Sequence, residues 1–225
     1  MSDLFLFAIL PYVCLAVAVV GLAWRVVARR GTMGTRSSQF LEGKVLFWGS
    51  VPWHYAILSL LAAHLLAVLF PGSWAVLLGD PLRLALAEMT GLALGVWAVV
   101  ACALLVARRV FNARLRLVTT PLDWLVLALL LVQVGTGVAI ALTLRWGSVW
   151  YLHTAAPWLR SLAMLDPRIE LVALLPSIAK VHALAAFLLL AVAPFSRLVH
   201  ALAVPVGYLW RAPQVVVWNS RRKAA

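Results

Sequence analysis

Long apolar stretches alternate with short polar segments along the whole chain. Apolar residues dominate five stretches, at about 4–25, 46–70, 85–107, 122–144 and 176–201. Each is close to the roughly 20 residues that an α-helix needs to cross a bilayer. The pattern therefore predicts an all-α integral membrane bundle of five transmembrane helices. We expect residues 1–225 to form one domain, in which residues 202–225 are a C-terminal cytoplasmic tail.

The segment between the fourth and fifth stretches is too polar to cross the bilayer. Residues 146–169 are rich in aromatic side chains, and Trp150, Tyr151 and Trp158 lie close in sequence to Arg160. Aromatic side chains with a polar end favour the interface between lipid and water. We expect this segment to form an interfacial helix on the outer, periplasmic side.

Composition indicates a membrane protein and not a nucleic-acid binder. Hydrophobic residues make up 65% of the chain and the mean hydropathy is +1.02, whereas soluble domains are about 45 to 50% apolar. The formal net charge is +12, but the basic residues are spread between the apolar stretches. We therefore expect membrane lipid, and no nucleic acid, as a partner.

The distribution of the 19 basic residues predicts the orientation of the chain. If there are five spans, fourteen basic residues fall on one side: Arg25, Arg29, Arg30, Arg36, Lys44, Arg108, Arg109, Arg114, Arg116, Arg197, Arg211, Arg221, Arg222 and Lys223. Short cytoplasmic loops are enriched in Lys and Arg. We therefore expect a prokaryotic cytoplasmic membrane, with the N-terminus outside and the C-terminus in the cytoplasm.

Four of the five histidines lie inside apolar stretches, two on the second and two on the fifth: His54, His64, His182 and His200. An ionisable side chain at bilayer depth is costly and marks a functional site, and histidine is a usual axial ligand of haem iron. Because the two stretches run antiparallel, His64 lies at the depth of His182 and His54 at the depth of His200. The pattern predicts two haems, one near each face of the membrane.

The spacing of the histidines does not match in every respect. His54 and His64 are about 15 Å apart on an ideal helix, whereas His182 and His200 would be about 27 Å apart. Pro194 lies between the latter two and can kink the fifth helix. A competing interpretation is that the histidines form hydrogen bonds between helices. A single zinc or copper ion fits less well, because each pair is spread too far along its helix.

The remaining metal-binding residue types suggest no further site. Cys14 and Cys102 both lie in apolar stretches, and the chain has no Cys-x-x-Cys or Cys-x-x-Cys-His motif. Any haem would therefore be of b type, held without a covalent bond to the protein. His153 falls in the interfacial segment, and we interpret it as a surface histidine.

Several local motifs resemble one family. Residues 194–198, Pro-Phe-Ser-Arg-Leu, precede His200, and residues 204–209 contain Val-Pro-Val and Tyr-Leu. Further matches are Ser37, Ser38, Gln39, Leu41, Lys44, Arg108, Arg109, Phe111, Arg114, Arg116, Thr119, Thr120, Asp123 and Gln133. With the ten-residue and eighteen-residue histidine intervals, these resemble the gamma subunit of membrane-bound respiratory nitrate reductase.

The resemblance implies a five-helix dihaem cytochrome b. Such a subunit oxidises quinol near the outer face and passes electrons to an iron-sulfur subunit and then to a molybdenum catalytic subunit in the cytoplasm. By resemblance, His64 and His182 ligate the outer haem iron, and His54 and His200 ligate the inner one.

The resemblance also implies a quinol site. A lysine before the third span supports quinol oxidation in the family, and Arg83 is its nearest counterpart here. Arginine can donate hydrogen bonds to a quinol oxygen but is a poor proton acceptor. Glu88 is therefore a candidate acceptor, and the alternative is an interfacial carboxylate that pairs with Arg83 or faces solvent.

Other basic residues are candidate partners of the haem propionates. Arg108, Arg109 and Arg114, with Arg116, could bind propionates of the inner haem, dock partner subunits or simply follow the positive-inside rule. Lys180 lies near the outer face, where topology does not explain its charge. It could bind a propionate of the outer haem, or extend to the membrane interface.

We therefore expect a quinol-oxidising electron-transfer subunit of a nitrate reductase, with two haems b and quinol as substrate. Nothing in the chain would contact nitrate. A similar subunit of another quinone-linked oxidoreductase is an alternative, and a haem-free membrane anchor or transporter is an alternative of another class.

Overall fold

The part of the chain that the structure describes is an all-helical bundle, with five helices long and apolar enough to cross a membrane. The computed structural model describes residues 2–28, 44–144 and 147–202. The five candidate spans are Phe5–Ala28, Val45–Leu69, Pro81–Phe111, Pro121–Thr143 and Ser177–Phe195. The predicted fold class is therefore confirmed. Most of the predicted tail, and the basic residues between positions 29 and 43, lie outside the described residues.

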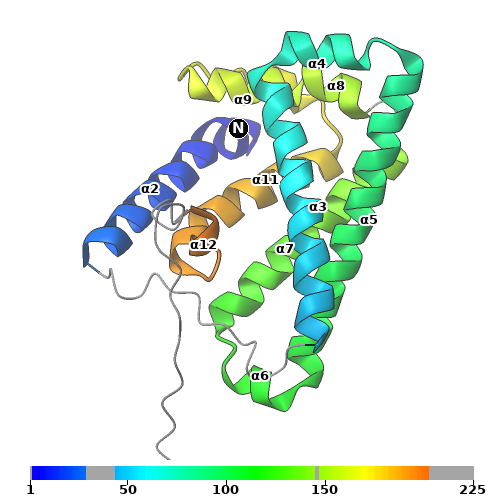
Figure 1. Cartoon of the computed structure of the whole chain (residues 1–225). Coiled ribbons are helices and arrows are strands. Elements are labelled where there is room, and N and C mark those ends of the chain that lie inside the picture. Colours follow the sequence, from blue (N-terminus) through cyan, green and yellow to red (C-terminus); the bar gives the residue numbers. More distant parts are fainter. Residues whose placement is uncertain (1, 29–43, 145–146, 203–225) are drawn as a thin grey trace, which may run out of the picture.

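The long helices pack side by side in an order that differs from their order in the chain. They are α2 (Leu10–Ala28), α3 (Lys44–Leu69), α5 (Pro81–Phe111), α7 (Pro121–Thr143) and α11 (Ser177–Val192). Helix α3 packs on α5, α5 on α7, α7 on α11, and α11 on α2 (Figure 1). Long helices that follow each other in the chain run in opposite directions, so the segments that connect them lie alternately at the two ends of the bundle.

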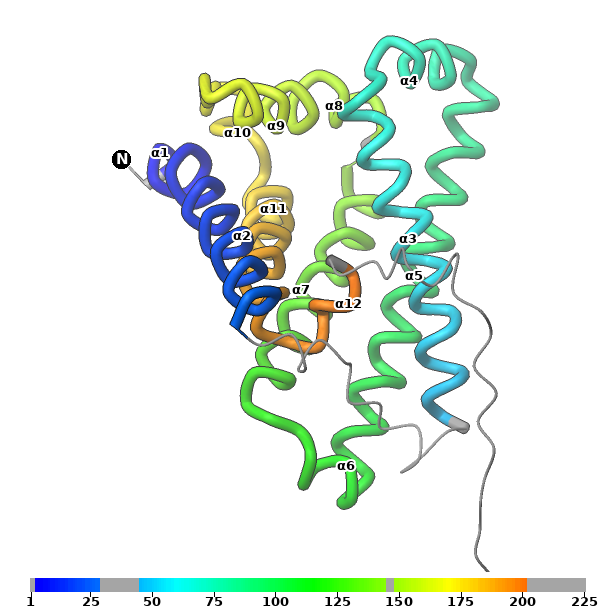
Figure 2. The backbone as a smooth tube through the Cα atoms, turned by 60° about the vertical axis from the view of Figure 1, so that its left-hand side comes forward, coloured from blue at the N-terminus to red at the C-terminus, as the bar shows by residue number. Residues whose placement is uncertain are grey.

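Short helices occupy both ends of the bundle (Figures 1 and 2). One end, called here the α8 end, has α1 (Ser2–Leu4), the π-helix η1 (Phe5–Ile9), α4 (Pro71–Leu78), α8 (Gly147–His153), α9 (Ala155–Ala163) and α10 (Glu170–Ala173). The opposite α6 end has α6 (Ala113–Leu117), while the 3₁₀ turn η3 (Ala193–Phe195) and α12 (Val199–Leu202) lie between this end and the middle of the bundle. Helices α4, α8 and α9 lie across the bundle, as expected of interfacial elements. The predicted interfacial segment between the fourth and fifth spans thus forms mainly two helices, α8 and α9.

Capping residues explain where two of the long helices begin. Asp80 caps α5 by accepting hydrogen bonds from the backbone N–H groups of Leu82 and Arg83, both at 3.0 Å. Thr120 and Asp123 form a capping box at the start of α7. Proline follows the cap in both cases, at a position where its missing N–H costs little. Helix α5 therefore begins at Pro81, four residues before the predicted start at 85.

The fifth span is not one continuous helix, which corrects the prediction of a helix over 176–201. Helix α11 ends at Val192 and is followed by the 3₁₀ turn, and His200 lies on the separate helix α12. Pro194 lacks a backbone N–H and cannot continue the α-helical hydrogen bonding. The ten residues from His182 to Val192 rise about 15 Å, the same as the interval between His54 and His64. After the break, the ring of His200 lies beside that of His54, with ring centroids 6.1 Å apart.

Three apolar clusters hold the elements together. Small residues dominate the first, where Ala56 on α3 meets Ala98 and Ala101 on α5, and small side chains let membrane helices approach closely. A second cluster centres on Trp158 of α9, whose indole N–H donates to the backbone oxygen of Phe7 at 3.0 Å. The third joins α8 to α3, α4 and α5, with Leu152 at its centre. These contacts fix the cross-lying helices over the α8 end.

Candidate functional site: two histidine pairs

The histidines of α3 both have one ring nitrogen fixed by their own helix. Nδ1 of His54 lies 2.7 Å from the backbone oxygen of Ser50, and Nδ1 of His64 lies 2.7 Å from that of Leu60. A carbonyl oxygen can only accept, so each Nδ1 carries the proton and donates it. Metal-binding histidines usually hold their second nitrogen in this way, which leaves Nε2 with a free lone pair.

His54 and His200 lie beside each other near the α6 end. Their ring centroids are 6.1 Å apart and the ring planes are inclined by 56°. Nδ1 of His200 donates to the backbone oxygen of Arg197 at 2.6 Å, so this ring has the same tautomer as His54. Two metal–imidazole bonds of about 2 Å in line place ring centroids about 6 Å apart. The pair therefore has the spacing of two axial ligands on one iron.

His64 and His182 are the second predicted pair, and both lie in the halves of α3 and α11 that are nearer the α8 end. Nδ1 of His182 lies 3.0 Å from the hydroxyl oxygen of Thr136. That hydroxyl donates to the backbone oxygen of Val132 at 2.6 Å, so it accepts from His182. His182 thus shares the tautomer of the other three histidines.

The surroundings of His182 leave a polar group unsatisfied. The side-chain nitrogen of Gln133 lies 3.0 Å from Nε2 of His182, while the side-chain oxygen of Gln133 is buried and has no hydrogen-bond partner among the described residues. Gly137 lies against the ring, since a Cβ there would be 3.2 Å from Cε1 of His182. Buried polar atoms are rarely left unpaired. With Nδ1 protonated, the Gln133 amide N–H donates to the one lone pair of Nε2, so this nitrogen can bind a metal only after Gln133 turns away.

Three of the histidines, His54, His64 and His200, have the tautomer and exposure that suit a ligand of haem b, and His182 has the tautomer but its Nε2 accepts from Gln133. All four histidines have Nδ1–H groups held by oxygen acceptors, and His54, His64 and His200 have exposed rings. Among the residues that the structure describes, no group of three or more His, Cys, Asp or Glu could hold a bare metal ion. Pairs of neutral imidazoles are the donor set of a bis-histidine haem.

Tyr151 of α8 is a neighbour of His64 to which sequence reasoning gave no role. Its hydroxyl donates to the backbone oxygen of His64 at 3.3 Å, and its ring stands edge-on to the imidazole with centroids 5.3 Å apart. Burial raises the pKa of Tyr151 to about 12, so the phenol stays protonated at neutral pH. The cluster of aromatic residues in the interfacial segment was the only available signal.

Arg83 and Glu88 lie on α5 at the α8 end but have separate partners. Arg83 donates to the backbone oxygens of Leu77 and Val76 at 2.9 and 3.3 Å. Glu88 accepts from the backbone N–H of Ser148, the second residue of α8, at 3.2 Å. The structure therefore gives Glu88 a backbone partner on α8 where the sequence suggested a pair with Arg83.

Helix α8 contacts both Glu88 and the residue His64. Ser148 contacts Glu88 and Tyr151 contacts His64, and residues three apart share one face of a helix. Trp150, on the same helix, has a buried indole N–H without a hydrogen-bond partner among the described residues. It lines a cavity of about 290 Å³ together with Thr143, Leu144, Leu175 and Pro176. Helix α8 therefore contacts a carboxylate and a histidine, and through Trp150 it also lines this cavity.

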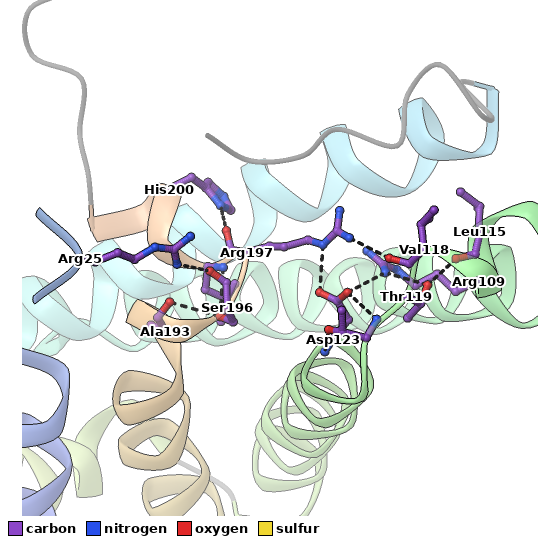
Figure 3. Close-up of polar contacts among 12 residues, drawn as sticks. Arg25, Arg109, Leu115, Val118, Thr119, Asp123, Ala193, Ser196, Arg197 and His200 are labelled. Atoms are coloured by element: carbon purple, nitrogen blue, oxygen red, sulfur yellow. Dashed lines mark hydrogen bonds and ion pairs between the residues drawn. The ribbon is translucent and has the colours of Figure 1, made fainter. Parts of the chain in front are cut away.

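The basic residues predicted to bind propionates differ in their contacts. Arg108 is buried and Arg114 is exposed. Arg109 donates to Thr119 at 3.3 Å and faces Asp123 at 3.9 Å (Figure 3). Lys180 forms an ion pair with Asp3 at 3.2 Å and lies over the ring of Phe7. His153 is exposed on α8.

Comparison with known proteins gives a consistent answer over nearly the whole chain. Residues 3–219 match the family described as nitrate reductase gamma subunit. The chain is 31% identical to the nitrate reductase gamma chain of Bacillus subtilis, over 98% of this chain and 100% of that one. It is 31% identical to the respiratory nitrate reductase 1 gamma chain of Escherichia coli, over 95% and 96% of the two chains. It is also 31% identical to the nitrate reductase-like protein NarX of Mycobacterium tuberculosis, of which it spans 34%.

Proposed function

Because the chain belongs to the nitrate reductase gamma subunit family, we propose that it is a dihaem cytochrome b that oxidises quinol for a respiratory nitrate reductase. Nitrate would be reduced on a partner subunit, as the resemblance described above implies. The proposal concerns the electron route, and the two histidine pairs support it.

His54 and His200 would hold one haem, and His64 and His182 the other. When bound, the two haems would carry electrons from one end of the bundle to the other. The chain contributes neutral imidazoles whose Nδ1–H groups are held by oxygen atoms, which fixes the rings and directs Nε2 to the metal. The 6.1 Å separation of the His54 and His200 rings is the observation that carries this proposal.

The α6 end would face the cytoplasm. Its described basic residues are Arg25, Lys44, Arg108, Arg109, Arg114, Arg116 and Arg197, and cytoplasmic loops of membrane proteins carry such an excess. An iron-sulfur subunit, followed by a molybdenum catalytic subunit, would receive electrons at this end. Exposed Arg114 is available to dock such a partner, whereas Arg109 is occupied by Thr119 and Asp123.

Quinol would be oxidised at the α8 end, next to the haem of His64 and His182. Arg83 can donate hydrogen bonds to a quinol oxygen, and Glu88 can accept a proton. The contact of Glu88 with α8 supports this role, because the same helix contacts His64 through Tyr151. The quinol protons would leave on the outer side.

Haem content tests the proposal. We would purify the complex, record dithionite-reduced minus oxidised spectra and quantify haem b per chain by the pyridine haemochrome method. Wild type should contain two haems b, both reducible by a quinol analogue. His54→Ala and His64→Ala should each lose one haem.

His153→Ala is the matched control, since His153 is an exposed histidine on the cross-lying helix α8. This variant should retain both haems. Absence of haem from the wild type, or two haems in His64→Ala, would show that the histidines only join helices.

A further inference from the structure

The segment that carries His200 is held by side chains of two other helices. Residues 193–198 form a 3₁₀ turn and a bend between α11 and α12. Pro194 prevents a regular helix there, so helical hydrogen bonds alone do not fix the position of His200. The other three histidines lie on long helices, so helical hydrogen bonds already fix the positions of their backbones.

Two arginines anchor this segment from opposite sides (Figure 3). Arg25 of α2 donates to the backbone oxygens of Pro194 and Ser196. On the other side, Nε of Arg197 donates to Oδ1 of Asp123 on α7 at 2.9 Å, and Nη2 of Arg197 donates to the backbone oxygen of Val118 at 3.2 Å. The segment is therefore tied to both α2 and α7.

Arg197 links this anchor directly to the histidine. Its backbone oxygen accepts the Nδ1–H of His200 at 2.6 Å, while its side chain is held by Asp123. The Asp123 side chain is only 8% exposed, against 30% for Arg197. A buried carboxylate with a charged partner has few alternative positions, because an unpaired charge there would be costly.

We propose that Asp123 is a positioning residue for His200, and that it acts through its ion pair with Arg197 to set the orientation of this ligand. This inference rests on the proposed function, since it assigns Asp123 to the haem of His54 and His200. The haem of His64 and His182 should be insensitive to Asp123, because His182 is held by Thr136 on a continuous helix.

Asp123→Asn tests the inference in the purified complex. The amide oxygen of Asn can still accept from Thr120, which keeps the helix cap, but the ion pair is lost. We expect this variant to retain two haems per chain. The largest g value in the electron paramagnetic resonance spectrum of the haem of His54 and His200, called gmax, should shift, and the midpoint potential of that haem should rise. His200→Ala and His182→Ala, which should each lose one haem, assign the two signals.

A double variant separates positioning from a direct effect of charge on the haem. If Asp123 acts through Arg197, Asp123→Asn should cause no further shift in an Arg197→Met background. Arg197→Lys keeps the charge but cannot bridge Asp123 and Val118 with one planar group, so it should also shift gmax of the haem of His54 and His200. Asp166→Asn, which removes an exposed ion pair with Arg168, is the control and should change neither signal.

The outcomes distinguish the inference from the function on which it rests. Wild type without two haems b would remove the proposed function itself. If wild type has two haems, an unchanged signal in Asp123→Asn, additive shifts in the double variant, or equal loss of both haems would overturn the positioning role. A change confined to the haem of His54 and His200, absent from Asp166→Asn, would support it.

Discussion

Gly137→Ala offers a sharp test of the His182 site, because a single methyl group would press on the ligand ring. A Cβ at this position would lie 3.2 Å from Cε1 and 3.7 Å from Nδ1 of His182. Relaxed contacts between carbon atoms are about 3.5–4.0 Å. The imidazole must therefore shift by a few tenths of an ångström, away from the oxygen of Thr136 that fixes it.

The size of the effect follows from two opposing contributions. An added methyl group in a packed site typically costs about 1–3 kcal/mol, while replacing a helical glycine by alanine returns about 1 kcal/mol. Gly135 lies on the same helix, and a Cβ there would have nothing within 4 Å. Gly135→Ala should therefore show only the stabilisation of about 1 kcal/mol that alanine gives over glycine in a helix. The two variants should differ by about 2 kcal/mol, or roughly thirtyfold in affinity for the haem of His64 and His182.

Haem transfer to an excess of apomyoglobin measures this difference. We expect Gly137→Ala to lose one of its two haems faster than wild type, and Gly135→Ala to behave like wild type. The haem of His54 and His200 should leave both variants at the same rate. Equal transfer from Gly137→Ala and Gly135→Ala would refute the steric reasoning, and with it the placement of His182 at a haem.

Three further outcomes are expected. Glu88→Gln should lower kcat for quinol oxidation at least tenfold with unchanged haem content, because an amide cannot take up the proton. Full activity of Glu88→Gln would exclude Glu88 as the acceptor. Trp150→Phe, measured in the same assay, tests the cavity that Trp150 lines. Tyr151→Phe should retain both haems and lose about 0.5–1.5 kcal/mol of stability, because its hydrogen bond to the backbone oxygen of His64 is removed. Only the spectrum of the haem that His64 would bind should shift. A shift in the spectrum of the other haem would contradict this prediction. Because burial raises the pKa of Tyr151 to about 12, from an ordinary value of about 10, the folded chain holds this proton more tightly than the unfolded chain. Unfolding experiments should therefore show wild type losing stability relative to Tyr151→Phe as the pH rises from about 10 to 12, and parallel pH profiles would count against the burial.

Apolar stretches and histidine spacing were sufficient to predict the five spans and the proximity of His54 to His200. These features depend on periodicity and length, which a sequence displays directly. The structure places the rings of His54 and His200 side by side, as antiparallel packing requires. The roles of these residues as haem ligands remain a proposal.

Other features of the site depend on contacts between distant parts of the chain. Asp123 and Arg197 are 74 residues apart, and Lys180 and Asp3 are 177 apart. No local pattern selects such partners. Lys180 was expected to bind a propionate or extend to the interface, but the bundle brings Asp3 within its reach. The exact end of α11 was also missed, because Pro194 indicated a kink but not that the helix would stop.

The break after Val192 also gives the assembly of the protein an order. Helices form locally once they are inserted in the bilayer and then pack, so the site of His64 and His182 requires only that α3, α7 and α11 meet. The site of His54 and His200 additionally requires the contacts of Arg25 on α2 and Asp123 on α7 with a segment that has only a 3₁₀ turn and a short helix of its own. The proposed site at the α6 end would therefore be complete only after α2 and α7 have packed against this segment.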